Sequence, residues 1–197
     1  MKKLIAFACL AATICLATGT ALADNIKGRL GVTGKIGFLE TSDGDLGDRR
    51  IKPDIGFIGG GGLIYGVTDN IAAEFDFTRS EFGSDFPQSG KAGDFGITTL
   101  ALGAQYRFNV THTKLVPYAG AGLDVLLNEY DLGEVDDMVG IHFNGGIDYF
   151  IMKQLALNVD VRGIWAPEAD IKNAGVKVGN YDPSSFATTF GARFFFN

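Results

Sequence analysis

Alternation of apolar and polar residues is the feature that most constrains the fold of this chain. In Leu155–Trp165, one phase is apolar and ends in Trp165, whereas the other carries Asn158, Asp160 and Arg162. Because successive side chains of a β-strand point to opposite faces, a period of two predicts a strand with two different environments. One face of this strand suits an apolar solvent, and the other suits paired charges.

The same period recurs in seven further stretches of the sequence. They span residues 26–39, 55–67, 70–78, 97–108, 115–127, 141–149 and 185–196. The connections alternate between long segments and short turns, and the long ones are residues 40–54, 79–95, 128–140 and 166–184. This alternation predicts an up-and-down antiparallel sheet whose two ends differ, as in transmembrane β-barrels.

Aromatic residues on the apolar phase gather at the strand ends, which separates a membrane barrel from a soluble lipocalin-like barrel or sandwich. The ends next to short turns or the C-terminus carry Tyr65, Tyr106, Phe108, Tyr149, Phe194 and Phe196. The ends next to long connections carry Phe38, Phe57, Phe77, Trp165 and Phe186. Two aromatic belts are typical of the two membrane–water interfaces, whereas a soluble core has no reason to sort aromatics by height.

The fold class we predict is all-β: an eight-stranded antiparallel up-and-down transmembrane β-barrel that follows a cleaved signal peptide. In lipid, an open sheet edge leaves backbone groups without hydrogen bonds, so the last strand is expected to pair with the first. The barrel forms one domain, residues 24–197, with both termini on the short-turn, periplasmic side.

The first residues predict export. Residues 1–23 combine a basic start, an apolar run over 4–16 and a small-residue cleavage site at Ala21–Ala23. A transmembrane anchor is the alternative, but the run is shorter than the roughly 20 residues that a spanning helix needs. Both cysteines lie in this leader, and without it 15 basic residues face 23 acidic ones, a net charge of −8. An acidic chain is not expected to bind nucleic acid.

Several motifs resemble the OmpW family of small outer-membrane barrels. They are "PYAGAGLDV" (117–125), "GGIDYFIMKQLALNVDVRGIW" (145–165), the tail "YDPSSFATTFGARFFFN", and in the first half "YGVTDNIAAEFDFT" (65–78). The resemblance implies an eight-stranded barrel that admits small hydrophobic molecules and releases them sideways between strands. Two features depart from the family pattern: Asn197 follows the terminal aromatic Phe196, and Ser184 follows Asp182-Pro183 in place of Trp.

Charged residues on the polar phase are the first candidate site. They are Lys27, Arg29, Lys35, Arg107, Arg162 and Arg193 against Glu74, Asp76, Asp124, Asp148 and Asp160. In a membrane barrel they face a lumen that eight strands leave barely wide enough for side chains. We expect an ion-pair network, with a continuous ion path as the alternative, because isolated buried charges are costly. Asp160 and Arg162 are expected to pair with Lys35 or Asp124.

An apolar collar is the second candidate site. Near the long connections the inward phase turns aliphatic, at Leu39, Ile58, Ile97, Leu126 and Ile164. Lys27, Arg29, Glu74, Arg107, Asp148 and Arg193 are placed near the periplasmic ends, as a charged plug beneath this collar. We interpret the collar as a binding site for a small apolar ligand; simple packing of the upper lumen is the alternative.

Catalysis, metal binding and cofactors are not expected. His142 faces inward without a neighbouring serine, and no Gly-Lys-Ser/Thr follows the glycine run 59–62, which is more readily explained by close approach of strands. The acids Asp43, Asp45 and Asp48 form only a solvated loop cluster.

The sequence thus predicts a protein of the bacterial outer membrane that binds and admits small hydrophobic molecules. A structural or adhesin-like barrel with a closed lumen is the alternative. The expected partners are outer-membrane lipid and lipopolysaccharide, small hydrophobic ligands, and the outer-membrane assembly machinery, which reads the C-terminal strand.

Overall fold

The computed structural model describes residues 26–196, apart from 47–48, 87–89, 109, 111–112, 132–133 and 174–175. The predicted signal peptide, residues 1–23, lies outside these described residues. In the described part no helix is long and apolar enough to cross a membrane.

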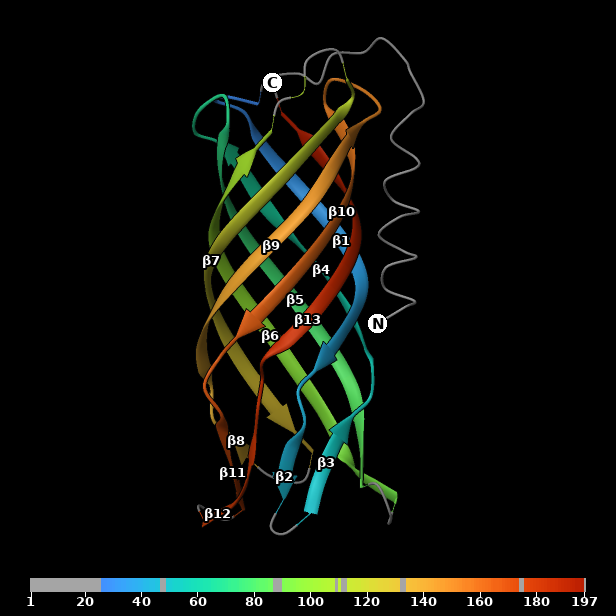
Figure 1. The fold of residues 1–197 in the computed structure, drawn as a ribbon, viewed down its shortest axis with the longest axis vertical. Helices are drawn as coiled ribbons and strands as arrows, with labels where there is room; N and C mark the ends of the chain where they lie inside the picture. The colour runs from blue at the N-terminus through green and yellow to red at the C-terminus, as the bar shows by residue number, and fades with distance from the viewer. Residues whose placement is uncertain are drawn as a thin grey trace.

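Eight antiparallel strands close into a barrel (Figure 1). They are β1 (Leu30–Thr41), β4 (Gly56–Gly66), β5 (Ile71–Phe86), β6 (Gly90–Arg107), β7 (Leu115–Tyr130), β9 (Met138–Phe150), β10 (Leu155–Trp165) and β13 (Ser185–Phe195). Each strand pairs with its neighbours in the chain, and β13 pairs with β1 to close the ring. The predicted fold class is confirmed.

The two phases of each strand separate as the sequence predicts. In β1, buried and exposed residues alternate along the whole strand. On the exposed phase, Leu157 and Val159 of β10 are 49% and 41% accessible, values that only an apolar solvent would favour for such side chains. Every ring of the two predicted aromatic belts is also exposed on this outer wall.

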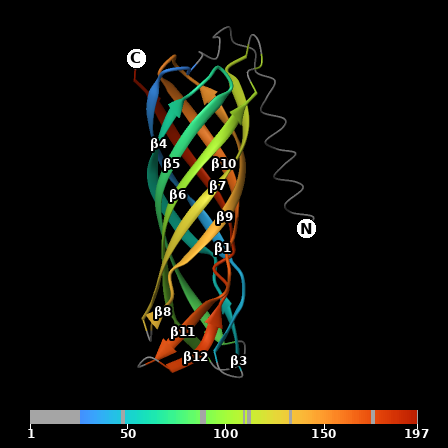
Figure 2. The ribbon, with the colours of Figure 1, turned by 90° about the vertical axis from the view of Figure 1, so that its left-hand side faces the viewer.

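The predicted long loops are wrong in one respect, because they contain further strands. These are β2 (Gly44–Leu46), β3 (Arg49–Pro53), β8 (Glu134–Val135), β11 (Ala169–Asn173) and β12 (Val176–Tyr181). Beyond the ring, the sheet continues from β5 through β3, β2, β12 and β11 to β8, and β5, β6 and β7 run into the same region. Figure 2 shows this extended end at the bottom, opposite the short turns. β2 and β8, with three and two residues, are too short to show a period of two, and β3, β11 and β12 span only five or six residues.

The start of the barrel also differs from the prediction. Ile26 was assigned to the lipid-facing phase of the first strand, but β1 begins at Leu30 and Ile26 is 3% accessible inside the short-turn end. Its neighbour Lys27 pairs with Gly66 in an isolated β-bridge outside the strands.

The glycine run of β4 allows the close approach of strands that its sequence predicts. A Cβ at Gly60 would lie 2.2 Å from the carbonyl oxygen of Phe77 on β5, and one at Gly62 would lie 2.4 Å from that of Phe75. Side chains at these positions would therefore push β4 and β5 apart.

Candidate functional site

The lumen is layered, and its first layer, at the short-turn end, is apolar. It consists of Ile26, Ile64, Ala72, Val116, Phe150, Ala156 and Phe195. The stacked rings of Phe150 and Phe195, 5.8 Å apart, help to fill it. The prediction of charges near this end is correct for Glu74, Arg107, Asp148 and Arg193, which are buried next to this layer. It missed the apolar layer between these charges and the periplasmic rim. Phe150 and Phe195 each follow a residue of the predicted outer belt, Tyr149 and Phe194. They occupy the opposite phase of the strand, so their rings point into the lumen.

A charged layer lies next to the apolar layer, on the side of the extended end. Asp148 pairs with Arg107 at 2.7 Å and with Arg193 at 3.2 Å, and Arg193 also donates to Glu74 at 2.6 Å. Asp148 accepts a further hydrogen bond from Asn158 at 2.7 Å. All of these side chains are buried, so each charge depends on its partners for the solvation that water no longer supplies.

Asp76 forms the second centre of this layer. It pairs with Lys35 at 2.7 Å and with Arg162 at 2.5 Å. The acids Glu74 and Asp76 both stand on β5, whereas their cations come from β1, β10 and β13 across the lumen. Ion pairs therefore tie opposite walls of the barrel together, which favours the network over a continuous ion path.

The predicted partners of Asp160 and Arg162 are wrong. Asp160 accepts hydrogen bonds from Tyr118 at 2.8 Å and from Asn144 at 2.9 Å, and it lies 4.0 Å from Arg162, which pairs instead with Asp76. Period and height alone cannot identify such partners, because the tilt and stagger of the strands decide which side chains meet across the lumen.

Asp124 has a partner that sequence reasoning missed. Its carboxylate lies 2.7 Å from Nδ1 of His142, and both side chains are buried. His142, Tyr118, Asn144 and Asn158 all stand on the inward phase, and that phase is the signal that assigns them to the lumen.

Lys27 and Arg29 do not belong to the network, which corrects the prediction for both. The Lys27 side chain is 60% accessible and lies 4.0 Å from Asp69 at the short-turn rim. Arg29 donates to the backbone oxygens of Phe196 and Lys153. Both precede the first residue of β1, so the phase of that strand does not direct their side chains into the lumen.

The predicted collar residues do meet inside the barrel. They belong to one buried cluster between the charged layer and the extended end, and each is at most 6% accessible: Leu39, Ile58, Ile97, Leu126 and Ile164. Further members of the cluster are Phe82, Phe95, Tyr130, Ile171, Tyr181 and Ala187. All except Ala187 lie in segments that were predicted as loops; Ala187 lies in the predicted strand 185–196 but was not singled out.

An aromatic stack fills the centre of the collar. The ring of Phe95 lies 4.3 Å from Tyr130, 5.1 Å from Tyr181 and 5.9 Å from Phe82, with near-parallel planes. The lumen near the extended end is thus apolar and filled by side chains of the protein. A ligand therefore enters only if the stacked rings move.

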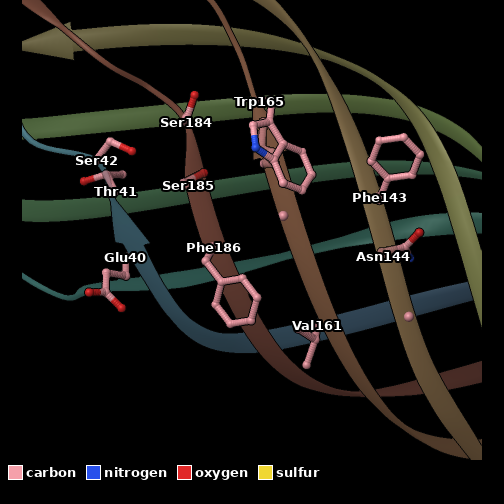
Figure 3. A pocket seen from close by; sticks show the side chains of 13 residues that line it. Glu40, Thr41, Ser42, Phe143, Asn144, Val161, Trp165, Ser184, Ser185 and Phe186 are labelled. Atoms are coloured by element: carbon pink, nitrogen blue, oxygen red, sulfur yellow. The ribbon is translucent and has the colours of Figure 1, made fainter. Parts of the chain in front are cut away.

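A pocket of about 610 Å³ opens in the outer wall beside the collar (Figure 3). Its lining comes from the ends of β1, β9, β10 and the start of β13: Glu40, Thr41, Ser42, Phe143, Asn144, Gly145, Val161, Gly163, Ile164, Trp165, Ser184, Ser185 and Phe186. Exposed rings of Phe143, Trp165 and Phe186 frame it, whereas Ile164 is a buried collar residue. The pocket therefore borders both the outer surface and the collar. We name it the wall pocket.

The strand ladder is interrupted next to the wall pocket. Pairing between β10 and β13 ends at Ile164 and Ser185, and Pro183, two residues before Ser185, has no N–H to continue it. The Ser184 hydroxyl replaces the missing bonds, because it accepts from the N–H of Ala166 and donates to its carbonyl oxygen, both at 3.2 Å. One side chain thus holds this part of the wall closed. We call this junction the Ser184 seam.

No group of three or more metal-ligating side chains of the kinds His, Cys, Asp and Glu occurs among the residues that the structure describes.

A closed antiparallel barrel with an apolar outer wall, two aromatic belts and a polar lumen defines the class of integral outer-membrane barrels. Residues 7–194 match the model of the outer membrane protein beta-barrel domain, so the chain belongs to this family, whose place is the bacterial outer membrane. A search of curated proteins found no match.

Solved structures of small outer-membrane barrels share the fold. The chain is similar to OprG from Pseudomonas aeruginosa, with a TM-score of 0.74 and 17% identity over 90% of this chain and all of that one. Neisserial surface protein A matches with a TM-score of 0.63 and 19% identity over 85% of this chain and 97% of the other. Outer membrane protein W of E. coli matches with a TM-score of 0.53 and 18% identity over 88% and 100%.

Proposed function

We propose that this protein admits small hydrophobic molecules through the collar and releases them sideways, through the wall pocket, into the outer membrane. The extended end faces the exterior, and the short turns face the periplasm. The apolar and charged layers close the lumen toward the periplasm, so an apolar molecule held in the collar has its favourable exit through the wall.

Ile164 is the observation that carries this proposal. It is 5% accessible within the collar cluster, and it also lines the wall pocket. A molecule that displaces the collar side chains therefore meets the wall pocket directly, without crossing the charged layer. Transfer of apolar surface between two apolar environments costs little, whereas passage through paired charges would require their separation.

The sequence motifs support a place within the OmpW-like subgroup of the family. The Asp182-Pro183 pair of that pattern is the pair that interrupts the ladder at the Ser184 seam. The C-terminal strand is proposed as the contact for the assembly machinery, and the outer wall as the contact for lipid and lipopolysaccharide. No catalytic step forms part of the proposal.

Uptake of a fluorescent apolar probe into protein-containing liposomes tests the route. Ile164→Arg and Leu126→Arg place a cation in the collar and should lower the uptake rate at least several-fold. Ile164→Leu keeps the volume and should leave uptake close to that of the natural protein. Unchanged uptake in both arginine variants would rule the route out.

A reversible lock provides a second test that needs no buried charge. In Ala166→Cys/Ser184→Cys, a disulfide would close the Ser184 seam, and the natural cysteines, Cys9 and Cys15, lie far from it in the sequence. Oxidation should block uptake and reduction should restore it. The matched control is Leu157→Cys/Ala192→Cys, because these two residues are partners within the intact ladder and neither lines the wall pocket. Equal uptake in all four states would contradict lateral release.

A surface-interaction function remains the second candidate, and the extended end favours it. β11 and β12 form a paired hairpin beyond the outer belt, which is a platform for contact with another surface. Shortening the hairpin within residues 172–178, away from the collar and the Ser184 seam, should then abolish binding of intact bacteria to that surface while probe uptake persists.

A further inference from the structure

Charge is distributed unevenly along the barrel axis. The four long connections and their strands, residues 40–54, 79–95, 128–140 and 166–184, contain 16 acidic and 7 basic residues, a net charge of −9. The rest of the chain from Asp24 onward has 7 acidic and 8 basic residues, a net charge of +1. A strong field of one sign at a channel mouth concentrates solutes of opposite charge and repels those of like charge.

The wall pocket also carries a negative charge. Glu40 is the one charged residue in its described lining, on the exposed phase of β1 opposite Phe186 of β13 (Figure 3). Among the side chains that the structure describes, which exclude those of residues 44–53, no ion pair of Glu40 is found. Thr41, Ser42, Ser184 and Ser185 add polar groups at the same edge, and the rings of Trp165 and Phe186 add apolar surface.

This arrangement separates two kinds of surface within one pocket. Phe143, Val161 and Trp165 offer an apolar wall, and the ring centroids of Trp165 and Phe143 lie 5.9 Å apart in a T-shaped contact. Glu40 and the hydroxyls offer an acceptor-rich edge toward the extended end. Such a pocket fits an amphiphile, with its apolar body along the rings and a donor head at Glu40.

We infer that the wall pocket selects small apolar molecules that carry a protonated amine and disfavours those that carry a carboxylate. This inference rests on the proposed function and names the substrate class of the same route. A carboxylate head would be repelled by both the charge of Glu40 and the acidic extended end, whereas both would attract an ammonium head.

Trp165 makes the inference directly measurable, because it is the only tryptophan of the chain and it lines the wall pocket. The protein in phosphatidylcholine vesicles is titrated at neutral pH with brominated alkyl chains of one length that end in an amine, a hydroxyl or a carboxylate. Quenching of Trp165 reports occupancy. We expect the amine to bind most tightly and the carboxylate least, with about tenfold between amine and alcohol from one close charge pair.

Glu40→Gln should remove most of the advantage of the amine and leave the affinity for the alcohol unchanged. Glu81→Gln is the matched control: it removes one exposed carboxylate from β5, separated from β1 by β4, and should leave the preference intact. Because each variant is compared with the same probe, partition of the probe into the vesicle cancels.

The outcomes separate the inference from the proposed function. Equal affinities for the three heads, or an amine preference that survives Glu40→Gln, would overturn the inference alone. Failure of every probe to quench Trp165 would overturn both. A change in Trp165 emission on adding Mg²⁺ alone, lost in Glu40→Gln, would assign Glu40 to a bridging cation and overturn the amine assignment.

Discussion

Two sides of the barrel wall are built differently. On one side β5, β6 and β7 run without a break from the short turns into the extended end, with paired backbones along most of their length. On the other side β1, β10 and β13 all stop near the Ser184 seam, and separate strands continue beyond it. Figure 2 shows the unbroken strands side by side.

The difference shows where the wall can open. Separating β5 from β6 would break a long ladder of backbone hydrogen bonds, each of which is costly to lose in lipid. At the Ser184 seam, Pro183 has already removed one donor and a side chain closes the gap. Between the Ser184 seam and the short turns, the ion pairs of β5 with the cations of β1, β10 and β13 hold the interrupted side in place.

Removing one of these cross-lumen anchors should have the largest effect. Asp76→Asn leaves Lys35 and Arg162, both buried, without their shared partner. The free energy of unfolding in lipid vesicles should fall by about 3–5 kcal/mol, measured by urea titration with Trp165 fluorescence. Asp69→Asn, which removes an exposed rim pair, should cost less than about 1 kcal/mol. Equal losses would show that the anchors do not carry the interrupted side.

Loosening the Ser184 seam should have an intermediate effect. In Ser184→Ala, the N–H and the carbonyl of Ala166 both lose their partner. Local opening should become roughly tenfold more frequent, seen as faster amide exchange at Ala166 and faster probe uptake. Thr98→Ala removes a hydroxyl from the unbroken side, where backbone pairing persists, and should change neither quantity. If both variants behave alike, the two sides do not differ in the way proposed.

The smallest effect concerns the outer face of the unbroken side, beyond the belt residue Phe77. Hydrogen bonding to Arg79 at 2.7 Å lowers the pKa of the Glu129 carboxyl below its usual range. The stability that this pair contributes is present above the ordinary pKa of a glutamate and is lost as the pH falls through the lowered value. In Arg79→Gln the pKa of Glu129 should return to the usual range in an NMR titration. Because the pair is exposed, the melting temperature should change little.

Much of the membrane-spanning part was predictable from local patterns. The bounds of β10, Leu155–Trp165, agree with the prediction because its period of two is unbroken and a short turn precedes it. The collar residues were found for the same reason, since their phase fixes their face and their position fixes their height. The prediction that the first strand begins at Ile26 was wrong, because the alternation in the sequence extends beyond the start of β1 at Leu30.

Partners across the lumen were not predictable in the same way. Asp76 meets Arg162, 86 residues away along the chain, only because the strands tilt and stagger around the ring. The extension strands failed for a different reason: β8 has two residues and β2 has three, too few for any period to show. Phe95 and Tyr130 were predicted as loop residues for another reason: β6 and β7 extend beyond the predicted strands 97–108 and 115–127, and the two rings stack in the collar.

The breaks between the ring and the extension also determine which changes of length the chain tolerates. A deletion of one residue within β10 would exchange its lipid and lumen faces, placing Asp160 and Arg162 against hydrocarbon. A deletion at Pro167 or Glu168, between β10 and β11, falls in an irregular link, keeps Ala166 at the Ser184 seam and leaves the alternation on either side intact. A change of length at this link therefore leaves the register of the ring unchanged.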